Sequence, residues 1–122
     1  MQYTITESDL GHFCVITVDG GVGNSDILEL HRDIIEAIAH YHHDAFLIDI
    51  RTLLGRPELL SVMHEGDKLP PGSWKQVRKM AVLDNVGYRI DAIFAETVMN
   101  ARGLHVRFFF DETMAMEWLM AG

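Results

Sequence analysis

Short apolar runs alternate with helix-like repeats along this chain. The clearest run is Ala-Phe-Leu-Ile-Asp-Ile-Arg at 45–51, which is almost wholly apolar before it ends in charged residues and a turn. Such a run is typical of a strand that is buried on both faces, as in a parallel sheet covered by helices. Because ligands meet such sheets at the carboxyl ends of the strands, the loop at 49–55 is the first place to look for a site.

The segment before this strand predicts a hairpin and a helix. Alternating or apolar runs at 3–6 and 13–18 indicate two antiparallel strands. From Asp26 to about Tyr41, apolar residues recur every three or four positions, which is the period of an amphipathic helix. The predicted buried face of that helix comprises Ile27, Leu30, Ile34, Ile38 and Tyr41.

A second helix is predicted directly after the central strand. It would begin at 55–57, where Pro57 occupies a first-turn position that needs no amide proton, and end near Gly66. The following segment, 67–74, contains Pro-Pro-Gly and is the least regular part of the chain.

Two further strands and two further helices complete the pattern. The run at 76–83 predicts a strand, after which Asp84 or Asn85 is expected to cap a helix that stops at Gly103. A last strand is predicted at 104–110, with Asp111 capping a short final helix. The third helix is expected to bury Ile90, Ile93, Phe94, Val98 and Ala101.

The order β-β-α-β-α-β-α-β-α defines the fold class. Strands that alternate with helices require crossover connections and therefore a mostly parallel sheet, to which the hairpin adds an antiparallel pair. We predict a single α/β domain over residues 1–122, with a mixed, mostly parallel central sheet and about four helices. The chain shows no internal repeat and no linker.

Charge and composition exclude several classes of function. The formal net charge of −8 disfavours nucleic acid and anionic lipid headgroups as partners. No apolar run approaches the ~20 residues needed to cross a bilayer, and the start of the chain lacks the pattern of a secretory signal. We therefore expect a cytoplasmic protein without membrane insertion; its single cysteine cannot form an internal disulfide.

Three segments carry a resemblance to a known family. Phe-Leu-Ile-Asp-Ile-Arg at 46–51, Lys-Met-Ala-Val-Leu-Asp at 79–84 and Val-Arg-Phe-Phe-Phe-Asp at 106–111, taken with the opening hairpin, resemble the SpoIIAA-like family. These are STAS-type domains, a fold shared by anti-sigma-factor antagonists and the cytoplasmic ends of sulfate transporters. The resemblance spans nearly the whole chain and implies a STAS-like fold.

The chain departs from that family at one position. Antagonists of this type carry a phosphorylatable serine at the start of the helix after the central strand, whereas 54–59 reads Leu-Gly-Arg-Pro-Glu-Leu here. We therefore expect no phosphorylation switch. Members that lack the serine resemble a branch grouped with CRAL-TRIO lipid-transfer domains, which by analogy suggests a small apolar ligand.

The favoured function is a non-enzymatic regulatory or protein-interaction module. Its working surface would comprise the loop at 49–57, the start of the second helix and the turn at 84–88. Strand-end carboxylates are also commonly satisfied within the fold, so Asp49 and Arg51 either contact a partner or serve the loop itself. Self-association through an apolar edge near the termini is also expected. The residues assigned to the partner surface are Asp49, Arg51, Thr52, Asp84 and Asn85.

The first alternative is a carrier of a small apolar molecule. The ligand would lie between the sheet and the second and third helices, lined by Leu59, Met63, Trp74 and Phe94. The segment 68–74 would then be either a mobile lid or a loop pinned by Trp74 against the core. An apolar cavity of ~300–1,000 Å³ would favour this alternative.

An enzyme of unknown class is the second alternative. Cys14 lies in the middle of a predicted strand, where an unpaired cysteine is usually a small buried hydrophobe. Glu36, His40 and His43 have a spacing that could hold a metal ion, but no second cluster completes a ligand set. We therefore predict no catalytic residue, metal or cofactor.

Overall fold

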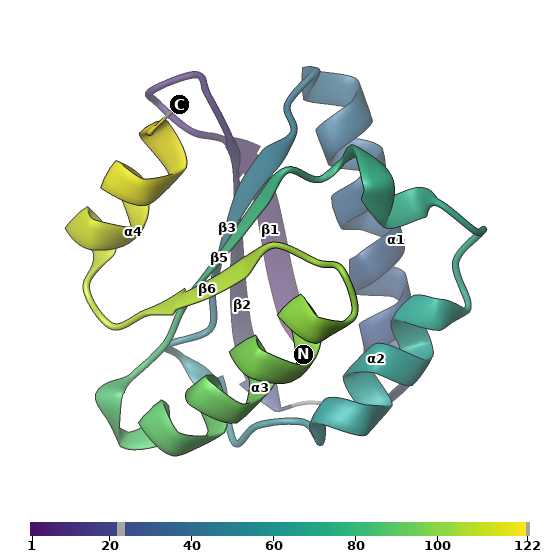
Figure 1. Ribbon diagram of the computed structural model, residues 1–122, viewed down its shortest axis with the longest axis vertical. Helices are drawn as coiled ribbons and strands as arrows, with labels where there is room; N and C mark the ends of the chain where they lie inside the picture. The colour runs from purple at the N-terminus through teal and green to yellow at the C-terminus, as the bar shows by residue number, and fades with distance from the viewer. Residues whose placement is uncertain (22–23, 122) are drawn as a thin grey trace.

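The computed structural model describes residues 1–21 and 24–121 and shows a sheet with helices on both faces (Figure 1). The strands are β1 (Gln2–Glu7), β2 (Cys14–Gly21), β3 (Ala45–Asp49), β4 (Leu53–Leu54), β5 (Lys79–Leu83) and β6 (Val106–Phe109). The helices are α1 (Asn24–Tyr41), α2 (Leu59–Asp67), α3 (Arg89–Ala101) and α4 (Glu112–Met120), with 3-10 turns η1 (Ser73–Gln76) and η2 (Val86–Tyr88).

The sheet is mixed and mostly parallel, as predicted. Its strand order is β1-β2-β3-β5-β6, in which β1 and β2 are antiparallel and every later neighbour is parallel. The short strand β4, which the sequence pattern did not predict, pairs with the end of β2, where Gly20 lies beside Leu53.

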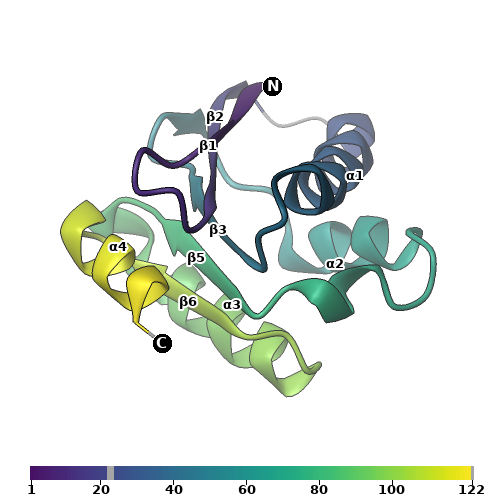
Figure 2. The ribbon, with the colours of Figure 1, turned by 90° about the horizontal axis from the view of Figure 1, so that it is seen from above.

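Each face of the sheet has its own hydrophobic core. Phe46, Val82 and Val106 point to one face and pack with α1, whereas Leu47, Leu83 and Phe109 point to the other face and pack with α4. This alternation is the period-two geometry of strands that are buried on both sides. Viewed from above, α4 lies on one side of the sheet and α1 and α2 lie on the other (Figure 2).

The cap of α4 and most of the buried face of α1 are as predicted, although Tyr41 at the end of that face is only partly buried. In α1, the side chains of Ile27, Leu30, Ile34 and Ile38 are buried. Asp111 caps α4 by accepting a hydrogen bond from the backbone N–H of Met114 at 2.9 Å. Gly103, with φ of +93°, ends α3 in the left-handed region that glycine tolerates.

The predicted starts of three elements are wrong. Helix α2 begins at Leu59, so Pro57 lies before the helix and not in its first turn. Strand β5 begins at Lys79, because Ser73–Gln76 forms the turn η1. Neither Asp84 nor Asn85 caps α3 with its side chain, because η2 intervenes between them and the helix.

The predicted inward face of α3 is also wrong. Ile90, Ile93 and Phe94 are 80%, 61% and 62% exposed, and Ala92 is the residue of α3 that is buried. Helix α3 is oriented instead by the outer edge of β6, where backbone N–H and C=O groups need hydrogen-bond partners. Glu96 accepts the N–H of Phe108 at 2.8 Å, and Asn100 bonds both the N–H and the C=O of Val106, at 3.1 and 2.8 Å.

Candidate functional site

The residues predicted for a partner surface fall into two separate arrangements. Asp49 and Arg51 form a two-point ion pair, with Nε donating to Oδ1 at 3.0 Å and Nη2 donating to Oδ2 at 2.8 Å. The backbone N–H of Arg51 also donates to Asp49 Oδ1 at 3.1 Å, and Nη2 lies 3.9 Å from Glu112 of α4. Partial burial would raise the pKa of Asp49, but the hydrogen bonds from Arg51 outweigh it and the pKa is lowered. In this geometry Asp49 and Arg51 bond to each other and hold the start of the loop after β3.

Thr52 and Asn85 tie neighbouring loops together. The hydroxyl of Thr52 donates to the backbone C=O of Val18 and to the carboxylate of Asp19. The amide of Asn85 donates to the C=O of Arg51 at 2.8 Å. Both side chains therefore fix the loop between β3 and α2 at the carboxyl end of the sheet.

Asp84 has a partner that the sequence pattern did not reveal. Its side chain is buried and forms an ion pair with Arg56, whose Nε donates to Asp84 Oδ2 at 3.1 Å. The guanidinium of Arg56 also donates to the C=O of Leu53 at 2.8 Å and lies 3.8 Å from the ring centroid of Tyr88. Arg56 therefore anchors the segment before α2. The sequence pattern did not reveal the pair because its partners are 28 positions apart.

A large apolar pocket opens between α2 and α3, on the face of the sheet that α1 covers. Its volume is about 1020 Å³, at the upper end of the ~300–1,000 Å³ of ligand sites. All four residues predicted for an apolar ligand line it: Leu59, Met63, Trp74 and Phe94. We call this cavity the α2–α3 pocket.

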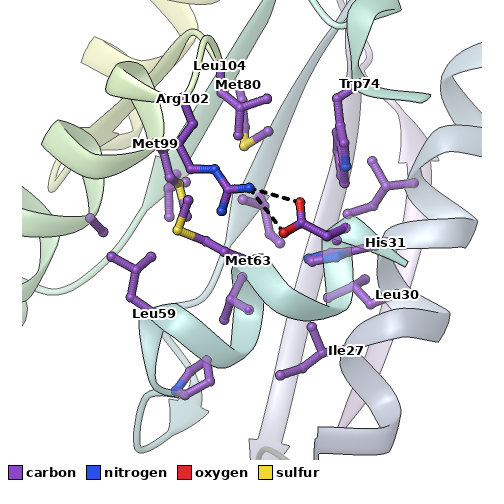
Figure 3. A pocket seen from close by; sticks show the side chains of 18 of the residues that line it. Ile27, Leu30, His31, Leu59, Met63, Trp74, Met80, Met99, Arg102 and Leu104 are labelled. Atoms are coloured by element: carbon purple, nitrogen blue, oxygen red, sulfur yellow. Dashed lines mark hydrogen bonds and ion pairs between the residues drawn. The ribbon is translucent and has the colours of Figure 1, made fainter. Parts of the chain in front are cut away.

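Apolar side chains of the sheet and of the helices line the interior of the α2–α3 pocket. Ile48, Met80 and Val82 of the sheet form its floor, together with Phe108. The walls come from α1, α2 and α3 and from the segments that follow α2 and α3, and Figure 3 labels side chains from each of these parts. The wall residues that sequence reasoning missed include Ile27, Leu30, Met99 and Leu104.

The ion pair between Asp67 and Arg102 joins α2 to the end of α3 beside the pocket. Arg102 Nη2 donates to both carboxylate oxygens of Asp67 at 3.1 Å. In Figure 3 the dashed lines of this pair lie between Met99 on one side and Trp74 on the other. The side chains are 48% and 60% exposed, so the pair is largely solvated.

His31 is the unusual polar group of the pocket wall. Its Nδ1 atom is buried without a hydrogen-bond partner, and its ring packs edge-on to Trp74 with the centroids 5.4 Å apart. Burial lowers the pKa of His31 to about 4, with a smaller opposing effect from Glu65. Trp74 is thus held against α1, which matches the pinned alternative for the segment 68–74.

The described residues contain no group of three or more His, Cys, Asp and Glu side chains placed to hold a metal ion. His43, one of the three spaced for a metal, bonds to Glu7 at 2.6 Å. Cys14 is fully buried in the core, and burial raises the pKa of its thiol to about 11. Within the described part of the chain, no helix has the length and apolarity of a membrane span.

Solved structures share this fold, including two that align over nearly the whole of this chain. A protein of the DUF3478 family with a SpoIIAA-like fold from Shewanella loihica aligns with a TM-score of 0.66 and 19% identity, covering 97% of this chain and 92% of its own. An anti-sigma factor antagonist from Mycobacterium paratuberculosis aligns with a TM-score of 0.59 and 16% identity, covering 98% and 96%. No protein-family model matches the chain, and no curated protein matches it either. The chain therefore has a SpoIIAA-like, STAS-like fold, as the sequence resemblance implied.

Proposed function

We propose that this protein is a non-enzymatic binding module whose α2–α3 pocket holds a small apolar molecule. The observation that carries the proposal is the pocket itself, with a volume of about 1020 Å³ and a lining dominated by aliphatic and methionine side chains. Methionine suits such a site because its flexible, polarisable side chain adapts to ligands of irregular shape.

The charged groups around the pocket narrow the ligand class. Arg56 is bonded to Asp84, and Arg102 is bonded to Asp67, so both arginines of the lining already have carboxylate partners. Burying a further charge in this interior would be costly without a partner. The pocket therefore favours an uncharged molecule, or one whose polar end stays in solvent. The same pairing supports binding over acid–base catalysis.

Narrowing the pocket is expected to weaken ligand binding. Met63→Trp should weaken binding of the neutral fluorescent probe N-phenyl-1-naphthylamine roughly tenfold, or by ~1.4 kcal/mol, because the larger indole takes up space that the probe would occupy. Leu54→Trp is the matched control, because Leu54 is 72% exposed and lies outside the pocket lining. Fluorescence titration gives the affinities, and native mass spectrometry of the wild type shows whether a molecule co-purifies. Equal probe affinities for both variants and the wild type would contradict the proposal.

A protein-interaction module is the second candidate. The observation that favours it is the outer face of α3, where Ile90, Ile93 and Phe94 are exposed beside the pocket. The same fold occurs in the anti-sigma factor antagonist from Mycobacterium paratuberculosis, which supports a role in binding another protein. We also propose that the module works without a phosphorylation switch, because 54–59 has neither serine nor threonine. A cytoplasmic location and self-association remain predictions.

A further inference from the structure

The elements around the α2–α3 pocket differ in how firmly they are held. The floor and the α1 wall belong to the buried core, with Ile27, Val82 and Ile34 almost inaccessible to solvent. Helix α2, by contrast, buries none of its residues, and Leu60 is 77% exposed. Few buried apolar contacts mark the parts of a protein that open most readily.

Helix α2 is nevertheless anchored at both ends. Before it, Arg56 is bonded to Asp84 and stacked on Tyr88. In its last turn, Gly66 packs closely on His31 of α1, where an added Cβ would lie 3.4 Å from Nδ1, and directly after the helix Leu69 is buried. The helix can therefore change its distance from α3 without leaving the molecule.

Two glycines flank these anchors. Gly55 and Gly72 have φ values of +78° and +85°, in the left-handed region that other residues adopt at a cost. Loop positions of this kind can absorb the backbone rotations of a moving segment. The first turn of α2 adds no rigidity, because it has no side-chain cap and no acidic residue.

Among the described residues, the side-chain hydrogen bond or ion pair that links α2 to α3 is Asp67–Arg102. Exposed pairs of this kind are weak and are screened by salt. The other ion pair at this end of α2, Lys68–Glu65 at 2.9 Å, lies within the segment and does not reach α3.

We propose that α2 is a gate over the α2–α3 pocket, held closed against α3 by the Asp67–Arg102 ion pair. Opening breaks the pair and moves α2 away from α3 between its two anchors. The identity of the ligand rests on the proposed function, whereas the motion of α2 also occurs in the protein without a ligand. Raising the salt concentration should open it.

The test combines amide hydrogen exchange with stopped-flow binding of N-phenyl-1-naphthylamine. Arg102→Gln should raise both the exchange rate of α2 amides and the dissociation rate of the probe, roughly two- to fivefold as expected for an exposed pair. Lys68→Gln is the matched control, because it removes a pair at the same helix end without touching α3. In the wild type, sodium chloride should raise the exchange rate of the α2 amides and the dissociation rate of the probe. In Arg102→Gln, it should leave both rates unchanged.

A double variant that exchanges the two charges separates loss of the ion pair from a general loss of stability. Asp67→Arg combined with Arg102→Asp should restore slow exchange in α2. Unchanged exchange of the α2 amides in Arg102→Gln would overturn the gate, whether or not the probe binds. Faster α2 exchange in a protein that binds no apolar probe would leave the gate standing and contradict the proposed ligand.

Discussion

At the scale of single residues, the chemistry around the pocket is dominated by groups that already have partners. Arg56 and Asp84, like Arg51 and Asp49, are paired within the fold and fix loops at the carboxyl end of the sheet. His31 differs from these pairs, because its Nδ1 atom is buried without a hydrogen-bond partner. An imidazole in such a place resists protonation, which makes it the residue whose effect on stability depends most clearly on pH.

His31 is expected to destabilise the protein in mild acid. Its pKa falls from 6.5 to about 4 on folding, so the unfolded chain binds more protons between these values. Stability is therefore fully present above pH ~6.5 and is lost as the pH falls towards 4, by about 3 kcal/mol in total.

Urea unfolding from pH 7 to pH 4 measures this effect. His31→Phe keeps a ring beside Trp74 but cannot titrate, so it should lose less stability than the wild type over that range. His64→Phe, which replaces an exposed histidine of α2, is the control. Parallel losses in His31→Phe and the wild type would assign the acid sensitivity to other groups.

At the scale of elements, polar contacts decide the orientation of helices that hydrophobic spacing alone misassigns. The stripe Ile90, Ile93 and Phe94 has the spacing of a buried face, yet α3 turns Glu96 and Asn100 towards the open edge of β6. Each of those side chains satisfies backbone groups that would otherwise lack partners beside the core. Bonds between residues 6 and 12 positions apart across a turn leave no periodic signature in the sequence.

Lys79 plays a similar part for α4. Its side chain is buried, and Nζ donates to the C=O of Trp118 and of Ala121, both at 2.7 Å. A cation at the C-terminal end of a helix satisfies terminal carbonyl groups and interacts favourably with the negative end of the helix dipole. The strand thus holds the last turn of α4 against the sheet.

Replacing Lys79 is therefore expected to loosen α4. Lys79→Met keeps most of the side-chain volume but leaves two carbonyl groups without their charged donor, which should lower the free energy of unfolding by about 2 kcal/mol. Lys75→Met, at an exposed position, should change it little. Chemical denaturation monitored by the fluorescence of Trp118 and Trp74 gives both values, and equal stability of the two variants would contradict this role.

At the scale of the whole molecule, helices cover both faces of the sheet, but the pocket opens on one of them. Helix α4 covers one face with the buried residues Ala115 and Leu119, whereas the other carries the α2–α3 pocket and the exposed side of α3. Both candidate functions therefore use the same face of the protein.

Binding of a partner protein to the outer face of α3 can be separated from ligand binding. Ile93 is 61% exposed and does not line the pocket, so Ile93→Glu should remove an interaction on this face without affecting probe binding. Met114→Glu changes an equally exposed apolar residue on α4 and is the control. Affinity capture with each variant should recover a partner with the wild type and Met114→Glu only. Recovery with all three proteins would exclude the α3 face as the interface.

Local patterns were sufficient for much of this architecture. Apolar runs predicted β3 and the end of β5, and helical spacing predicted most of the buried face of α1. Each of these features depends on neighbours within one element. Leu59, Met63, Trp74 and Phe94 were also placed at the same pocket. The pairs Arg56–Asp84 and Asp67–Arg102 escaped prediction because they join residues 28 and 35 positions apart.

The floor of the α2–α3 pocket has a consequence for how such a protein can change. Met80 and Val82 line the pocket and also belong to the core that holds the sheet to α1. Substitutions there alter ligand preference and folding together, and most of them will be destabilising. Residues of α2 such as Leu59 and Met63 face the same space while burying little, so they can vary at small cost to the fold. New ligand preferences should therefore evolve first in α2, whereas the sheet remains nearly invariant.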